Sequence, residues 1–107
     1  MSVTQIGSSD QFQEVIGQNK LIIVDFSADW CGPCQIISKT FDELAKSYTE
    51  IGFYKVDVDE LRDLSKSQKI KGIPTFLFFK KGEKVFEIIG AHKEKIIEAI
   101  NEIQEKK

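Results

Sequence analysis

Trp30-Cys31-Gly32-Pro33-Cys34 is the stretch that decides the fold, and it holds both cysteines of a 107-residue chain. Two cysteines at this spacing lie about one helical turn apart, close enough to form a disulfide without moving the backbone. The preceding apolar run, residues 21–26, predicts a buried strand. An apolar stripe at helical spacing follows and predicts a helix over about residues 33–49; it consists of Ile37, Phe41, Leu44, Ala45 and Tyr48. The cysteine pair therefore lies where a strand passes into a helix.

Cys31 falls at the N-terminus of this predicted helix. Pro33 is compatible with the first turn, because the N–H groups there lack helical partners in any case. The peptide dipoles at a helix N-terminus favour negative charge, which stabilises the thiolate form of a cysteine. We therefore expect Cys31 to be the exposed, reactive thiol and Cys34 to be the shielded one.

The composition limits the class of protein. The chain is long enough for one domain, residues 1–107, and its formal charge of −2 argues against a nucleic-acid or anionic-membrane partner. The first residues have neither the basic segment nor the apolar segment of a signal peptide, and no stretch is apolar enough to span a membrane. We therefore expect a cytoplasmic protein. In that reducing compartment a lone C-x-x-C pair is more often catalytic than structural.

The remaining patterns predict an α/β fold. Strands are expected near residues 3–6, 21–27, 53–58, 75–79 and 85–89, with a hairpin turn at residues 80–83. Helices are expected near residues 9–17, 33–49 and 93–105, with a short polar helix containing Leu61 and Leu64. This order predicts a central mixed sheet of five strands flanked by four helices. The sheet should be parallel where helices cross over and antiparallel at the final hairpin.

Asp25 lies inside the apolar run that predicts a buried strand. A carboxylate there costs several kcal/mol unless it is neutral or paired, and buried acids of this kind gather at functional sites. If it is buried, desolvation should raise its pKa and allow it to exchange a proton with Cys34. The alternative is an aspartate at a strand end that turns into solvent. Lys55, expected on the adjacent strand, either moderates Asp25 or is solvated.

Two other interpretations of the cysteine pair are weaker. Zinc requires four ligands, and beyond the pair the chain offers one histidine, His92, and no second C-x-x-C. A static disulfide closing so small a loop would stabilise the fold little.

Pro74 opens a predicted strand, where it fits a rigid or cis turn better than a central strand position.

Together these motifs resemble the thioredoxin family, in its eukaryotic cytosolic type, over essentially the full length of the chain. The resemblance rests on residues 30–34 (WCGPC) with residues 73–75 (IPT) and on residues 24–28 (VDFSA). Residues 56–59 (VDVD), residues 78–82 (FFKKG) and Gly90-Ala91 add to it. The chain departs from many members at Ser27, where a second aromatic is common, and at Lys39, where a proline kinks the helix. Without that proline the helix keeps one more backbone hydrogen bond and should be straighter.

The resemblance implies a thioredoxin fold and a protein-disulfide reductase without a cofactor or metal of its own. Cys31 would be the attacking thiol, Cys34 the resolving thiol and Asp25 the buried acid–base group. Pro74 would carry a cis peptide bond beside the disulfide. A flat apolar surface would receive the substrate; its residues would be Trp30, Gly32, Pro33, Val58, Gly72, Ile73, Pro74, Gly90 and Ala91. The implied partners are thioredoxin reductase, drawing on NADPH, and disulfide-containing proteins, and the chain should be a monomer that maintains cell redox homeostasis.

The residues between the cysteines suggest the direction of the reaction. Gly32 and Pro33 supply no imidazole, so the Cys31 thiolate is less stabilised than in relatives with histidine there, which favours a reductant. An oxidase or isomerase is disfavoured on the same ground. The remaining alternative is a binding subunit of the same fold whose thiols are incidental, but such a scaffold needs neither the cysteine pair nor Asp25 and Pro74.

Overall fold

β2 (Leu21–Ser27) runs through the centre of the sheet in the computed structural model, which describes residues 3–105. Within these residues the sheet has five strands in the order β1-β3-β2-β4-β5. The outer members are β1 (Val3–Gln5) and β5 (Glu83–Ile89), and β3 (Gly52–Asp57) and β4 (Thr75–Lys80) flank β2. Every residue of β2 is buried. The expectation of a strand covered on both faces is therefore confirmed.

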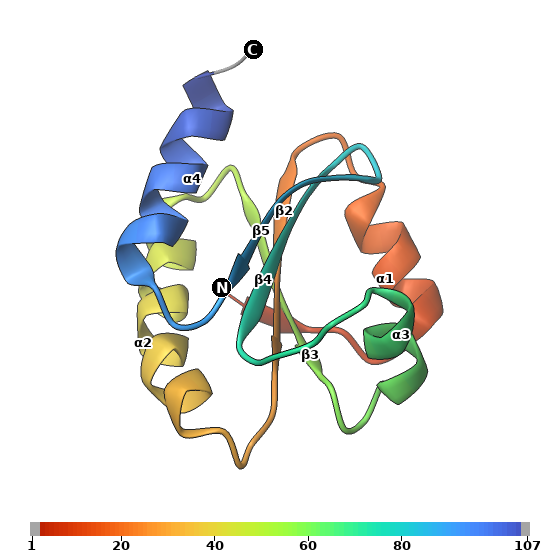
Figure 1. Ribbon diagram of the computed structural model, residues 1–107. Helices are drawn as coiled ribbons and strands as arrows, with labels where there is room; N and C mark the ends of the chain where they lie inside the picture. The colour runs from red at the N-terminus through yellow and green to blue at the C-terminus, as the bar shows by residue number, and fades with distance from the viewer. Residues whose placement is uncertain (1–2, 106–107) are drawn as a thin grey trace.

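Helices cover both faces of the sheet (Figure 1). α2 (Gly32–Ser47) and α4 (Lys93–Glu105) pack on one face, while α1 (Ser9–Ile16) and α3 (Arg62–Ser67) pack on the other. None of the helices in residues 3–105 is both long and apolar enough to cross a membrane. The α/β architecture expected from the sequence, a mixed five-stranded sheet with four helices, is confirmed over this range.

Two apolar clusters show which way each β2 side chain points. Leu21 and Ile23 belong to the cluster under α2 and α4, whereas Ile22 and Val24 belong to the cluster under α1 and α3. Successive side chains of a strand point to opposite faces. Asp25, two residues after Ile23, therefore faces α2, the helix that begins at the cysteine pair.

The direction of β4 corrects the topology expected from the sequence. We expected parallel pairing wherever a helix joins two strands, but β4 is antiparallel to β2 although α3 connects it to β3. Asp57, the last residue of β3, pairs with Ser27, and Thr75, the first residue of β4, pairs with Phe26. The connection through α3 therefore returns the chain to the end of the sheet where β3 left it, without crossing to the other end, and β4 runs back along β2. The final hairpin, β4 with β5, is antiparallel as expected.

The hairpin turn has the backbone that its sequence predicts. Lys81 and Gly82 both adopt positive φ, 54° and 84°, between β4 and β5. Two successive residues of this kind match the twist of the flanking strands and make a tight two-residue connection. α1 is capped by Ser8, whose hydroxyl oxygen accepts a hydrogen bond of 3.1 Å from the Gln11 N–H.

Substituting Gly52→Ala should destabilise the fold. A Cβ at Gly52 would stand 2.6 Å from Cδ1 of Ile22 and 2.9 Å from Cε1 of Tyr54. Ile22 is fully buried, and the close packing of protein interiors leaves a buried side chain little room to shift. We expect the free energy of unfolding to fall by about 1–3 kcal/mol in a denaturant melt.

The matched control for this prediction is Gly7→Ala, whose Cβ would meet only the Gln11 side chain at 3.7 Å. Both substitutions restrict the unfolded chain in the same way, so the difference between them reports crowding in the folded state. Equal stabilities for the two variants would show that the sheet accommodates a methyl group at Gly52.

Candidate active site

Cys31 and Cys34 are joined by a disulfide at the start of α2, with their Cα atoms 5.2 Å apart. Cys31 has extended backbone angles (φ −89°, ψ 111°) and is the N-cap of the helix. The Cys34 N–H donates a hydrogen bond of 3.2 Å to Cys31 Sγ. A donor aimed at this sulfur at a helix N-terminus favours negative charge on it. The geometry therefore supports the reactive thiolate expected at Cys31.

The two cysteines differ little in accessibility. Cys31 is 5% exposed and Cys34 is 3% exposed, because both pack in one small cluster with Ala28, Val58 and Ile73. Neither cysteine is exposed in the disulfide form, so the expected order of exposure, which concerns the reduced thiols, stays a prediction. Any difference in reactivity rests on charge stabilisation at Cys31 Sγ, which also lies 4.0 Å from the Ile73 carbonyl oxygen.

Asp25 lies fully buried on the face of β2 that α2 covers. Neither of its carboxylate oxygens has a hydrogen-bond partner among the described residues. Burial raises the pKa of Asp25 from its ordinary value to about 7, the nearby Lys55 ammonium lowers it, and the Asp42 carboxylate raises it. The solvated strand-end alternative for Asp25 is thus excluded. The Asp25 carboxyl is poised to exchange a proton near neutral pH.

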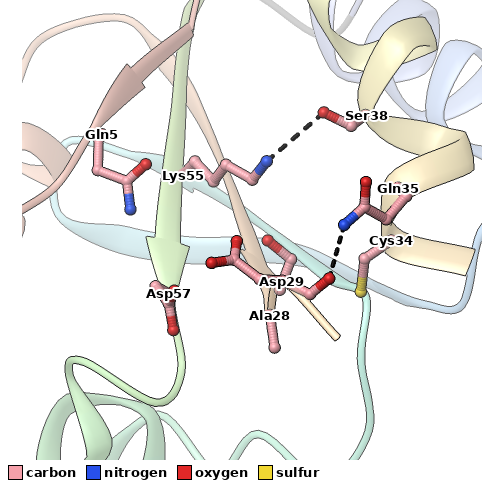
Figure 2. A pocket seen from close by; sticks show the side chains of 9 residues that line it. Gln5, Ala28, Asp29, Cys34, Gln35, Ser38, Lys55 and Asp57 are labelled. Atoms are coloured by element: carbon pink, nitrogen blue, oxygen red, sulfur yellow. Dashed lines mark hydrogen bonds between the residues drawn. The ribbon is translucent and has the colours of Figure 1, made fainter. Parts of the chain in front are cut away.

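A polar hollow of about 140 Å³ opens beside the disulfide (Figure 2). It is lined by Gln5, Ser27, Ala28, Asp29, Cys34, Gln35, Ser38, Lys55 and Asp57. Lys55 Nζ points across it and donates to Ser38 Oγ at 3.5 Å, and Gln35 Nε2 donates to the Asp29 carbonyl at 2.6 Å. Lys55 on β3 also lies opposite Asp25 on β2 in the register of the two strands. Lys55 is thus placed to moderate Asp25, and the small side chain of Ser27 leaves the hollow open.

Lys39 does not interrupt the helix that follows the cysteines. α2 is one helix from Gly32 to Ser47, and Lys39 lies exposed near its middle. A residue with a backbone N–H can continue the hydrogen-bond ladder that a proline would break. The straighter helix expected without the proline stays a prediction.

Trp30 is held by a residue that the sequence did not identify. Its indole is 71% exposed, yet Nε1 donates a hydrogen bond of 2.7 Å to Asp59 Oδ2. The Asp59 N–H in turn donates to Asp57 Oδ1 at 2.8 Å. A signal was available: β2 and β3 are parallel, and the residues that follow two adjacent parallel strands emerge at the same edge of a sheet.

The residues expected to form a substrate surface fall into three groups. Trp30, Val58, Gly72 and Ile73 line one shared hollow. The Gly90 N–H donates to the Pro74 carbonyl at 2.7 Å, and the Ile73–Pro74 peptide bond is cis as expected. Three further residues are exposed, on the first turn of α2 and just before α4; they are Gly32, Pro33 and Ala91.

Position 90 requires glycine because of its backbone conformation and because of a neighbouring side chain. Its φ is +104°, and an added Cβ would stand 2.7 Å from Nε2 of His92. His92, the one histidine of the chain, therefore packs against Gly90. Among residues 3–105, no three His, Cys, Asp or Glu side chains form a group that could hold a metal ion.

Comparisons with known proteins place this arrangement in a family. The thioredoxin family model matches residues 3–102. The thioredoxin of Callithrix jacchus is 49% identical over 102 residues, which cover 94% of this chain and 97% of that protein. The thioredoxin of Homo sapiens is 48% identical over 103 residues, covering 94% of this chain and 98% of that protein.

Solved structures agree with the sequence comparisons. The thioredoxin of Malassezia sympodialis superposes with a TM-score of 0.89 at 42% identity, covering 94% of this chain and 90% of that one. The thioredoxin of Trypanosoma brucei brucei superposes with a TM-score of 0.95 at 27% identity, covering 98% and 93% of the two chains. With its cysteine pair bridged at the start of α2, the chain belongs to the thioredoxin family of protein-disulfide oxidoreductases.

Proposed function

We propose that this chain reduces disulfide bonds in other proteins and is itself reduced again by thioredoxin reductase, with electrons from NADPH. The observation that carries the proposal is the Cys31–Cys34 disulfide at the N-terminus of α2, with the buried, unpartnered Asp25 on the strand facing that helix. A structural disulfide has no use for a buried acid whose pKa is raised to about 7. The chain acts as a cytoplasmic monomer with one domain that contributes to redox homeostasis.

The first step uses the helix N-terminus. The Cys31 thiolate, stabilised by the Cys34 N–H, attacks one sulfur of a substrate disulfide. The substrate S–S bond breaks, its second sulfur leaves as a thiolate that takes a proton from water, and a mixed disulfide joins Cys31 to the substrate. Trp30, Gly32, Pro33, Val58, Gly72, Ile73, Pro74, Gly90 and Ala91 supply the surface against which the substrate segment lies.

The second step uses Asp25. The Cys34 thiol gives its proton to the Asp25 carboxylate, and the resulting thiolate attacks Cys31 Sγ. The mixed disulfide breaks, the Cys31–Cys34 bridge forms, and the substrate leaves as a thiolate that takes a proton from water, while Asp25 gives up its proton before the next cycle. Two electrons have passed from the dithiol to the substrate. A pKa of about 7 suits this exchange because the carboxyl both accepts and releases a proton near neutral pH.

The direct test is reduction of insulin disulfides in the presence of NADPH and thioredoxin reductase. We expect turnover, followed as consumption of NADPH, and its loss in Cys31→Ser. Absence of turnover in the unmodified protein would leave the binding-subunit interpretation in its place.

The two cysteines should give opposite trapping results. Cys34→Ser should accumulate a mixed disulfide with substrate, because no resolving thiol remains, and Cys31→Ser should accumulate none. In the reduced protein, iodoacetamide should label Cys31 first, because thiolate rather than thiol is alkylated. Mass spectrometry of the labelled peptides measures the order, and preferential labelling of Cys34 would reverse the assigned roles.

Asp25→Asn should stabilise the fold at neutral pH. The folded pKa of Asp25, about 7, lies above the unfolded value of about 3.9. The penalty for burying the carboxylate is therefore absent below about pH 4, grows between pH 4 and 7, and is complete above pH 7, at roughly 4 kcal/mol. A buried unpartnered amide costs about 1–3 kcal/mol, so we expect a net gain of roughly 1–3 kcal/mol at pH 8.

Denaturant melts of Asp25→Asn between pH 4 and 8 measure this gain, which should shrink as the pH falls and reverse toward pH 4, where only the cost of the buried amide remains. Glu43→Gln is the control, since it removes an exposed carboxyl from α2 and should give no comparable pH dependence. The same Asp25→Asn protein should reduce insulin about 10²-fold or more slowly, because asparagine accepts no proton from Cys34. A variant that is less stable and fully active would remove Asp25 from the mechanism.

A further inference from the structure

The hollow beside Trp30 contains positive charge that the proposed reaction does not use. It has a volume of about 450 Å³ and an apolar floor formed in part by Trp30, Val58 and Ile73. Its rim carries three exposed cations, Arg62, Lys66 and Lys71. No carboxylate lines the hollow. This small region is therefore basic in a chain whose formal charge is −2.

Within residues 3–105 none of the three cations forms an ion pair. The ion pair observed in that range joins Lys84 to Glu87. The nearest turn does carry acids, but they are engaged or face elsewhere. Asp59 accepts the Trp30 indole hydrogen bond, while Glu60 and Asp63 line a neighbouring hollow that Arg62 shares. Lys66 and Lys71 do not line that second hollow. Asp63 precedes Lys66 by one helical turn on α3, so Lys71 is the cation whose charge is least offset by neighbouring carboxylates.

The basic hollow adjoins the reactive sulfur. Ile73 lines the hollow, and its carbonyl oxygen is 4.0 Å from Cys31 Sγ. A protein segment whose cysteine lies against Cys31 therefore has its neighbouring residues close to Ile73, and so close to the hollow that Lys66 and Lys71 also line. Unpaired cations on the rim of an apolar surface attract complementary charge and raise the rate of encounter more than they raise affinity.

We propose that this hollow selects disulfide-containing protein segments with aspartate or glutamate next to the reactive cysteine. The inference rests on the proposed function, because it assigns a substrate class to the same site. The apolar floor receives the segment, and Lys66 and Lys71, with Arg62, attract its acidic side chains. Segments without acidic residues gain no such attraction, so the charge acts as a preference and not as a requirement.

The test compares two symmetric peptide disulfides that differ only beside the single cysteine, one carrying aspartate and glutamate and the other asparagine and glutamine. The reduced protein is mixed with each peptide, the reaction is quenched with acid, and the released peptide thiol is measured by chromatography. Acidic neighbours also change the intrinsic reactivity of a disulfide. Each rate is therefore divided by the rate at which dithiothreitol reduces the same peptide.

We expect the normalised rate for the acidic peptide to exceed that for the neutral one by about threefold or more at low salt. The ratio should shrink toward one in about 0.5 M NaCl, where the screening length is only a few ångström. In Lys66→Gln/Lys71→Gln the ratio should fall close to one. The matched control is Lys46→Gln/Lys81→Gln, which removes the same amount of charge. Lys46 lies near the end of α2 far from Cys31, and Lys81 lies in the turn just after β4, so the ratio should stay that of the unmodified protein.

Four outcomes would overturn the inference. Equal normalised rates for the two peptides would refute the preference while leaving the reductase function intact, and reduction of neither peptide would remove the proposed function as well. An equal fall of the ratio in both double variants would assign the effect to net charge. Sedimentation of the unmodified protein and of the same variants tests whether a second copy of this chain occupies the hollow instead. Self-association that only Lys66→Gln/Lys71→Gln abolishes would identify that second copy as the partner.

Discussion

β2 is hydrogen-bonded along both edges, to β3 and to β4, and is covered on both faces by helices. Asp25 therefore has no surface exposed to bulk solvent, and its two carboxylate oxygens find no donor among the described residues. A carboxyl in such a place stays protonated to higher pH, and only the nearby Lys55 offsets this. The acid–base chemistry of the site depends on this burial. A shallower strand would leave Asp25 an ordinary, ionised carboxylate.

The reactive groups lie in environments that push their protonation in opposite directions. Cys31 at the start of α2 receives an N–H hydrogen bond on its sulfur, which favours the negative form. Asp25 lies beneath the same helix without a donor, which disfavours the negative form. Pairs of titratable groups driven apart in this way mark the donor and acceptor of a proton. The fold produces both effects with one junction, because the strand that buries the acid leads directly into the helix that activates the thiol.

Much of this arrangement followed from local sequence patterns. The apolar run around Asp25 predicted a fully buried strand, and the helical stripe after Cys34 predicted α2, because side-chain periodicity reports directly which faces of an element are covered. The position of the cysteine pair at a helix start followed from the same junction. The hairpin turn at Lys81 and Gly82 was equally readable, since few backbone conformations connect two strands so tightly. Each of these features depends on residues that are close together in the chain.

Features that depend on distant residues were decided only by the tertiary structure. β4 runs antiparallel to β2 because the connection after β3 returns the chain to the same end of the sheet, and periodicity carries no information on strand direction. The bond from Trp30 to Asp59, the nearly equal burial of the two cysteines, and the meeting of Lys66 and Lys71 with Ile73 all require β2, β3 and α3 to be packed together. The sequence by itself determined the elements and the chemistry they carry. Packing determined which charges surround that chemistry, because strand order and helix placement bring together side chains that are far apart in the chain.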